Sequence, residues 1–414
     1  MANVSSSNGL EKYPKLRFPG FDEPYRSTQL GDIASLVNRT DPKSNAPIMM
    51  LSAGNGFIMQ SEKYSRDNAG QSLKKYILLQ QGELAYNHGA SKAKQFGCCY
   101  ELTVPEARIP YVYHCFKIDG HEYTPYIAIA LNNTKMDKQL KRLVSSSVRM
   151  DGLLNISFED YMSVTLHLPT SNEQKRIADF LQKIDERIAV QEKLLASLKK
   201  YKRGAFEAVF SQRIRLVPAA EQHEWKKYRL TDFASRITRK NCGKTDIPLT
   251  ISAQYGLIDQ REFFSKTVAS TDMSGYYLLN SGEFAYNRST SNDYPFGSIK
   301  RLELYPMGAV STLYLCFAIK EDVVISDLAK WYFESTQWHR GISQICAEGA
   351  RNHGLLNVPT DGFFSTEHLL PSDRKEQIAI AKYLSLIQTK YDRAVEELEM
   401  LENVRKGLLQ QLFI

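Results

Sequence analysis

The chain repeats itself at a spacing of about 200 residues, and this internal duplication limits its possible folds more than any other feature. The stretch Lys74–Asn87 (KKYILLQQGELAYN) aligns with Ser274–Asn287 (SGYYLLNSGEFAYN), and the GLLN at residues 152–155 aligns with that at 354–357. The offset drifts by only a few residues over this length. Short loop insertions explain such a drift, so we expect the two halves to share one fold.

Each copy combines a globular part containing short strands with one long helix. Tyr111–Ile118 and Thr312–Ile319 are rich in aromatic and β-branched residues, as strands are, and Gly, Asn, Ser and Pro clusters separate such elements. Apolar residues then recur at alternating steps of four and three, from Ile177 to Val209 and from Ile380 to Leu412. This period is typical of a coiled coil. Two helices packed separately on two domains would show a wider and shorter stripe.

The predicted fold class is α+β, with two tandemly repeated mixed α/β domains separated by two long helices. The expected limits are residues 1–168 and 213–370 for the domains, and 169–212 and 371–414 for the helices. A helix of about 40 residues is roughly 60 Å long, whereas a domain of this size is roughly 40 Å across. The second domain must therefore begin and end near one end of the helices. We expect an antiparallel coiled coil and an approximate two-fold axis.

Net charge and cysteine usage indicate which partners and which cellular compartment suit the chain. The 414 residues carry 53 Lys and Arg against 46 Asp and Glu, a net charge of +7 that permits a polyanionic partner without requiring one. The six cysteines are scattered and form no CxxC, as in a reducing cytoplasm. The polar first residues lack the apolar core of a secretory signal. We therefore expect a cytoplasmic protein without membrane contact.

No motif in the sequence points to catalysis. The chain has no GxxxxGK[ST] loop, no GxGxxG motif and no Asp-Pro-Pro-Tyr tetrapeptide of the amino-methyltransferase type, and its eight histidines are scattered without metal-ligand spacing. Glu83 and Glu283 occupy matching places in the two copies, but each follows a glycine without a neighbouring acid or histidine. We interpret them as turn residues, and we predict no catalytic or metal-binding residue.

The loops after two equivalent strands carry different polar residues, as expected if two copies of one scaffold contact different bases. Arg and Lys can donate to guanine, Asn can pair with adenine, and Ser can contact bases or phosphates. The same composition also fits an ordinary solvated loop, and the sequence leaves both interpretations open. With two further equivalent segments, the candidate DNA-binding residues are Asn87, Ser91, Lys92, Lys94, Gln95, Arg149, Arg239, Lys240, Asn287, Arg288, Ser291, Asn292, Tyr294, Lys300, Arg301, Arg351 and Asn352.

The order of globular part, long helix, globular part and long helix resembles the specificity subunits of type I restriction–modification systems, over essentially the whole chain. Gly282–Leu302 (GEFAYNRSTSNDYPFGSIKRL) is similar to a frequent stretch of the family's target-recognition domains, whereas the first copy has NHGASKAKQFGCCYEL instead. The bases read by the first copy therefore cannot be inferred from the second. Stretches similar to the family's start, helix openings and helix endings are Pro14–Phe21, Leu168–Asp185, Leu369–Leu384, Lys202–Phe210 and Arg405–Phe413.

The resemblance implies that each globular part is a target-recognition domain for one half of a bipartite sequence in double-stranded DNA. It implies that the helices set the spacing of the halves and dock two methyltransferase (modification) subunits, which methylate adenine with S-adenosylmethionine. Motor and nuclease (restriction) subunits would use ATP and Mg, and this chain would bind no cofactor and catalyse nothing. Independently of the resemblance, a pseudo-symmetric pair of readers fits half-sites separated by about one helical turn.

Two other classes of function stay open from the residues alone. A scaffold that bridges two protein partners predicts no salt-dependent DNA binding. An enzyme with its active site in the duplicated parts would require titratable residues repeated at matching positions. A gel shift with the methyltransferase partner, repeated at several salt concentrations, would separate these classes.

Overall fold

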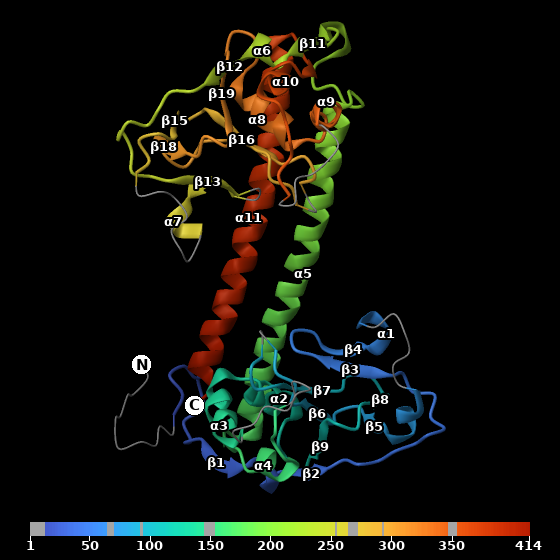
Figure 1. Ribbon diagram of the computed structural model, residues 1–414. Helices are drawn as coiled ribbons and strands as arrows, with labels where there is room; N and C mark the ends of the chain where they lie inside the picture. The colour runs from blue at the N-terminus through green and yellow to red at the C-terminus, as the bar shows by residue number, and fades with distance from the viewer. Residues whose placement is uncertain are drawn as a thin grey trace. The chain divides into compact units, whose positions relative to one another are not determined.

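The computed structural model describes residues 13–63, 70–91, 94–144, 154–252, 255–263, 272–291, 294–346 and 354–414 (Figure 1). The chain is mixed α/β and forms two compact units. Unit 1 comprises Met1–Gln191 with Glu397–Ile414, and unit 2 comprises Glu192–Glu396. Each unit therefore contains one globular part and a segment of both long helices.

Unit 1 is organised around an antiparallel sheet whose strands, among the described residues, follow the order β2-β9-β6-β7. The pairs β1-β10, β3-β4 and β5-β8 form smaller antiparallel sheets beside it. The elements up to the first long helix are β1 (Arg26–Gln29), the 3-10 turn η1 (Leu30–Asp32), β2 (Ala34–Leu36), β3 (Met49–Ser52), β4 (Gly56–Met59), α1 (Gln60–Lys63), η2 (Gly70–Lys75), β5 (Ile77–Gln80), β6 (Leu84–Asn87), β7 (Cys98–Glu101), β8 (Glu106–Ile109), β9 (His114–Ile118), α2 (Thr124–Leu131), α3 (Thr134–Leu143), α4 (Phe158–Met162), β10 (Thr165–Leu168) and α5 (Ser171–Phe210).

Unit 2 has the same strand order in its described residues. Its larger sheet runs β12-β19-β16-β17, and its smaller sheets are β11-β20, β13-β14 and β15-β18. This agreement is consistent with the repeat in the sequence. The elements are η3 (Ala219–Glu221), β11 (Lys226–Arg229), α6 (Leu230–Phe233), β12 (Ala234–Ile237), β13 (Leu249–Ser252), β14 (Gly256–Asp259), α7 (Gln260–Phe263), β15 (Tyr277–Asn280), β16 (Phe284–Asn287), β17 (Ser298–Arg301), β18 (Met307–Val310), β19 (Leu315–Ile319), α8 (Ser326–Glu334), α9 (His339–Ile345), α10 (Thr360–Phe364), β20 (Glu367–Leu370) and α11 (Arg374–Leu412).

The ends of the long helices belong to the hydrophobic cores of the units. In unit 1, Leu181 near the start of α5 shares a core with Leu412 and Phe413 at the end of α11. In unit 2, Phe206 near the end of α5 shares a core with Leu384 near the start of α11. Each such apolar side chain contributes about 1.5–3 kcal/mol when it is fully buried. Each globular part is thus completed by two segments that lie far apart in the sequence.

The apolar seam expected from the sequence is buried or half-buried at every position in both helices, whereas most other positions are exposed. In unit 1, Asp185 of α5 forms an ion pair with Arg405 of α11. In unit 2, the hydroxyl oxygens of Tyr201 and Tyr383 are 3.1 Å apart. Within each unit, the start of one long helix therefore lies beside the end of the other. Along the described parts of the chain, neither these nor the shorter helices have the apolar length needed to cross a bilayer.

A buried glutamate in the first turn of each long helix fastens it to its own globular part. The carboxylate of Glu173 accepts hydrogen bonds of 2.9 and 2.7 Å from the guanidinium of Arg17. The carboxylate of Glu376 accepts bonds of 2.6 and 2.8 Å from Arg215 and one of 3.2 Å from the indole N–H of Trp225. A buried carboxylate is stable only when it is paired in this way.

The glutamine that follows each glutamate makes an equivalent pair of buried contacts. The side-chain oxygen of Gln174 accepts from the N–H of Tyr123, and that of Gln377 accepts from the N–H of Ile325, both at 2.9 Å. Both side-chain amides also donate to a proline carbonyl just before the helix. The Glu-Gln pair repeated in the sequence therefore fixes where each helix leaves its globular part.

Candidate nucleic-acid interface

The loops 87–97 and 287–297, which follow β6 and β16, are held by the same tyrosine in both units. The hydroxyl of Tyr86 donates to the carbonyl oxygen of Phe96 at 2.6 Å, and that of Tyr286 donates to Phe296 at 2.8 Å. Both tyrosines are buried in the sheet, and burial raises the pKa of their hydroxyls, so both remain protonated donors at neutral pH. A rigid strand thus determines the far end of each loop.

A glycine closes each loop in a conformation that other residues disfavour. Gly97 and Gly297 have φ angles of +82° and +76°. A Cβ atom at either position would approach the carbonyl oxygen of Asn87 or Asn287 to within 3.0 Å. The recurring Phe-Gly of the sequence is therefore required by backbone geometry.

Replacing Gly297 by alanine is expected to destabilise unit 2 by about 2–4 kcal/mol, because a left-handed backbone conformation and a backbone clash both oppose the methyl group. Gly282→Ala is the matched control, since Gly282 also has a positive φ but has open space around it. The control should cost about 1 kcal/mol. Urea unfolding followed by tryptophan fluorescence measures both, because all three tryptophans lie in unit 2. Equal losses in the two variants would contradict the clash.

Each loop begins with an asparagine whose side chain caps the turn. The Oδ1 atom of Asn87 accepts from the N–H of Gly89 at 2.9 Å, and that of Asn287 accepts from the N–H of Ser289 at 3.0 Å. This is the local bond by which Asn stabilises turns. Both candidates therefore shape the loops, and their Oδ1 atoms are already engaged.

Each loop is hydrogen-bonded to the GLLN segment that is repeated at residues 152–155 and 354–357. The N–H of Leu154 donates to the backbone carbonyl of His88 at 2.9 Å, and the N–H of Leu356 donates to the backbone carbonyl of Arg288 at 3.0 Å. Thr290 adds a bond from its N–H to the carbonyl of Gly354 at 2.7 Å. Two sequence-distant polar segments therefore meet in each unit.

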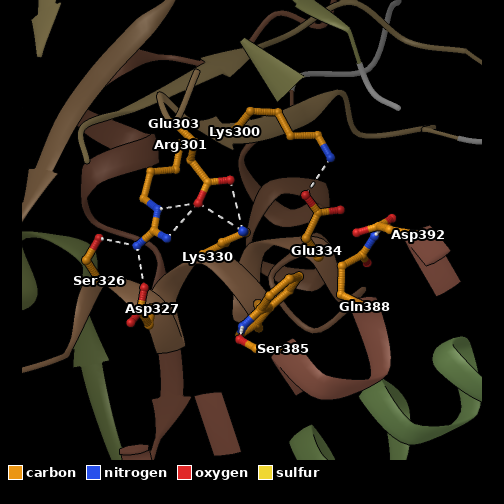
Figure 2. A network of polar contacts seen from close by, with 11 residues as sticks. Lys300, Arg301, Glu303, Ser326, Asp327, Lys330, Glu334, Ser385, Gln388 and Asp392 are labelled. Atoms are coloured by element: carbon orange, nitrogen blue, oxygen red, sulfur yellow. Dashed lines mark hydrogen bonds and ion pairs between the residues drawn. The ribbon is translucent and has the colours of Figure 1, made fainter. Parts of the chain in front are cut away.

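Lys300 and Arg301, two candidates on β17, are engaged in ion pairs inside unit 2 (Figure 2). Lys300 is only 8% exposed and is paired with Glu334 of α8. Arg301 contacts Glu303 at 2.7 Å and Asp327 at 2.8 Å. These contacts tie the strand to helix α8, and they weigh against a direct contact of either cation with DNA.

The carboxylate of Glu303 is the centre of this network, because Lys330 also approaches it to 2.9 Å. Burial by itself would raise the pKa of Glu303, but the hydrogen bonds from Lys330 and Arg301 outweigh burial and lower it. The group is therefore ionised at neutral pH, and the network is a stable structural feature of unit 2.

Arg239 and Lys240 are likewise engaged within unit 2. Arg239 is paired with Glu283, as Arg39 is with Glu83 at 2.6 Å in unit 1. Both glutamates also accept from the backbone N–H three residues earlier at 2.7 Å, which confirms that they are turn residues. The ammonium of Lys240 lies 4.5 Å from the ring centroid of Tyr277 and donates to a backbone carbonyl.

The candidates that point to solvent are fewer than the sequence suggested. Ser91 and Gln95 in unit 1, and Ser291 in unit 2, are exposed. Lys94 is half-buried and donates to the carbonyl of Asn132 at 2.7 Å, and burial lowers its pKa. The ring of Tyr294 lies 6.0 Å from the ammonium of Lys300.

Five candidates lie outside the described residues: Lys92, Arg149, Asn292, Arg351 and Asn352. Sequence reasoning also gave no role to His88, which we grouped with the scattered loop histidines although the alignment places it opposite Arg288. Within the described ranges, no group of three or more His, Cys, Asp or Glu side chains is arranged to hold a metal ion.

Comparison with known proteins gives matches of two kinds. Residues 28–200 match the family model of the type I restriction modification DNA specificity domain. The S subunit of the type I restriction–modification system from M. genitalium is 13% identical, with a TM-score of 0.57 over 97% of this chain and 99% of that chain. A structure described as the basis of complex assembly and conformational transition of a type I R-M system is 12% identical, with a TM-score of 0.52 over 96% of this chain and 99% of that one. No curated protein gives a significant sequence match.

Proposed function

Since residues 28–200 of this chain are a type I restriction–modification DNA specificity domain and the whole chain has the fold of an S subunit, we propose that each unit reads one half of a bipartite DNA target. The chain itself is a non-catalytic recognition subunit. Adenine methylation with S-adenosylmethionine and ATP- and Mg-dependent cleavage belong to its partner subunits. The chain binds none of these cofactors.

The observation that carries the proposal is the equivalence of loops 87–97 and 287–297. The same tyrosine, asparagine and glycine hold both loops, so the scaffold at this place is common to the two units. Ser91 and Ser291 are exposed at matching positions, whereas the exposed Gln95 of the first loop aligns with the exposed Pro295 of the second. A common scaffold with different exposed side chains suits two half-sites of different sequence.

We further propose that α5 and α11 form an antiparallel coiled coil that sets the distance between the half-sites, with an approximate two-fold axis. The buried seam and the contacts within each unit support this arrangement. The outer faces of the helices carry exposed apolar side chains, among them Val190 at 66% and Leu386 at 64% exposure. Exposed apolar side chains of this kind suit docking of the two modification subunits.

Exchanging residues 225–368 for the corresponding part of a related subunit is expected to change one half of the methylated sequence and to leave the other half as it was. The exchanged part begins just before β11 and ends within β20, so it carries its own loop and leaves only the last two residues of the β11-β20 pair, Leu369 and Leu370, unchanged. Methylome sequencing of cells that contain the modification subunits gives the result directly. A change in both halves would contradict independent reading.

A narrower exchange of residues 289–296 tests the loop itself. It keeps Arg288, Gly297 and the ion-paired Lys300, so the bonds of Arg288, the glycine turn and the ion pair on β17 remain. The second half of the motif should change at one or more positions, with each lost base contact costing about 1–3 kcal/mol. An unchanged motif would exclude loop 287–297 as a reader. Salt-independent binding of the complex to DNA would instead favour the protein-bridging scaffold.

A further inference from the structure

Residues 88 and 288 occupy equivalent places and make similar contacts with different chemistry. In unit 1 the ring nitrogens of His88 lie 2.8 Å from the carbonyl oxygen of Leu154 and 3.0 Å from that of Val112. In unit 2 the guanidinium of Arg288 donates to the carbonyl of Leu313 at 3.0 Å and to that of Val358 at 3.3 Å. Each side chain therefore connects its loop to two other segments of its unit.

The two side chains differ in the donors that they supply. A carbonyl oxygen only accepts, so each of the two contacts of His88 requires an N–H on the ring. A neutral imidazole has one N–H, whereas the imidazolium has two. Arginine keeps its donors at any ordinary pH. The geometry around His88, which is only 8% exposed, is therefore complete only when the ring carries both protons.

A second histidine shares this region of unit 1. His114 pairs with Tyr86 across the sheet, whereas in unit 2 Leu315 pairs with Tyr286. The ring centroid of His114 is 5.0 Å from that of His88, and its Nε2 lies 2.9 Å from the carbonyl of Ile156. Two histidines in unit 1 thus face the kind of carbonyl acceptors that Arg288 alone reaches in unit 2.

The surroundings of the pair disfavour the charged form of His114. Burial lowers the pKa of His114, and the positive charge of His88 lowers it further, while the bond to Ile156 and the charge of Glu159 act in the opposite direction. The other titratable groups that face the pair are Tyr86 of β6 and Tyr161 of α4, which stack on each other. Burial raises the pKa of both hydroxyls, so neither tyrosine supplies a negative charge.

We propose that His88 is the positioning residue of loop 87–97, that it holds this loop to Leu154 and Val112 only as the imidazolium, and that Arg288 does the same in unit 2 without depending on pH. At a pH at which the ring of His88 is neutral in the open loop, the closed loop carries one more proton than the open loop. The contact is therefore complete at low pH and is lost as the pH rises. Reading of one half-site becomes sensitive to pH, whereas reading of the other does not.

Hydrogen exchange of the free full-length chain at pH 6 and at pH 8.5 tests this inference without DNA. The reporter amides are the N–H of Leu154, which donates to the backbone carbonyl of His88, and the N–H of Leu356, which donates to the backbone carbonyl of Arg288. After correction for intrinsic exchange rates, opening at Leu154 should rise by up to tenfold for each pH unit over which the ring loses its proton. Opening at Leu356 should change much less. Equal behaviour of the two amides would overturn the proposal.

Two variants separate protonation from mere packing. His88→Arg combined with His114→Leu reproduces the pair found in unit 2, and it should keep Leu154 protected at both pH values. His88→Gln should leave Leu154 open at both. Nitrogen-15 NMR of the unaltered chain with labelled histidines measures protonation directly. The resonances that disappear in His88→Gln belong to His88. They must show two protonated ring nitrogens at pH 6. A neutral ring at pH 6 would refute the inference and would leave the DNA-reading proposal intact.

Discussion

Replacing Glu376 by alanine is expected to lower the free energy of unfolding of unit 2 by about 3–5 kcal/mol. The carboxylate of Glu376 accepts two bonds from Arg215 and one from the indole of Trp225. The side chain of Arg215 is only 16% exposed, so removing its partner leaves a largely buried, unpaired cation. The first turn of α11 would also lose one of its attachments to the globular part, while the bonds of Gln377 would remain.

Tryptophan fluorescence during urea unfolding measures this loss in unit 2. Glu224→Ala is the matched control, because it removes an exposed carboxylate beside Trp225 and should change stability by less than about 0.5 kcal/mol. Glu376→Gln keeps the size of the side chain and removes its charge, and it should fall between the two. If Glu376→Ala and the control had the same midpoint, the buried ion pair would not stabilise unit 2.

Removing one heptad from the middle of each long helix is expected to shorten the gap between the two halves of the DNA target by about three base pairs. Deleting residues 188–194 and 394–400 keeps the seam in phase and leaves the core residues Leu181, Leu384 and Phe413 in place. Seven residues correspond to about 10 Å of helix, and B-DNA rises about 3.4 Å per base pair. This prediction rests on the proposed spacer role of the helices.

The twist of DNA gives this experiment a second outcome that also supports the proposal. Three base pairs rotate one half-site by roughly 100° at about 10.5 base pairs per turn, whereas the heptad deletion rotates the units much less. If the complex cannot accommodate this rotation, modification is lost and no shorter gap is seen. A length-preserving variant, Glu192→Gln with Lys193→Gln at exposed positions, should keep the original motif. Full modification of the original gap by the deletion variant would show that partner subunits, and not the helices, set the spacing.

The sequence predicted the feature that depends on periodicity, since the seam of the helices follows from a seven-residue repeat. The need for glycine at positions 97 and 297 is apparent only from their positive φ angles in the structure. The Glu-Gln pair recurs in the two copies of the sequence, but the sequence does not predict which residues it contacts. Arg17 and Arg215, which pair with the two glutamates, lie about 160 residues away in the chain, and no local sequence pattern predicts a bond over such a separation.

The sequence does not predict which cations of the candidate site are engaged within the fold, because that depends on the side chains that distant segments bring beside them. Lys300 looked like a donor to DNA, but folding places Glu334 beside it. Arg288 looked equally available, but its guanidinium is directed to two backbone carbonyls. Composition drew attention to loops 87–97 and 287–297, but it could not separate the residues that support these loops from the exposed ones.

The discontinuous make-up of unit 1 bears on the order in which a nascent chain can fold. Its core includes Leu412 and Phe413, and the ring of Phe413 stacks on Tyr126 at 5.0 Å between centroids. Unit 2 is a single stretch, Glu192–Glu396, and all of it leaves the ribosome before these two residues do. Although unit 1 is translated first, it therefore waits with an incomplete core until unit 2 has emerged. Unit 2, whose synthesis begins later, is then the first unit whose core can be completed.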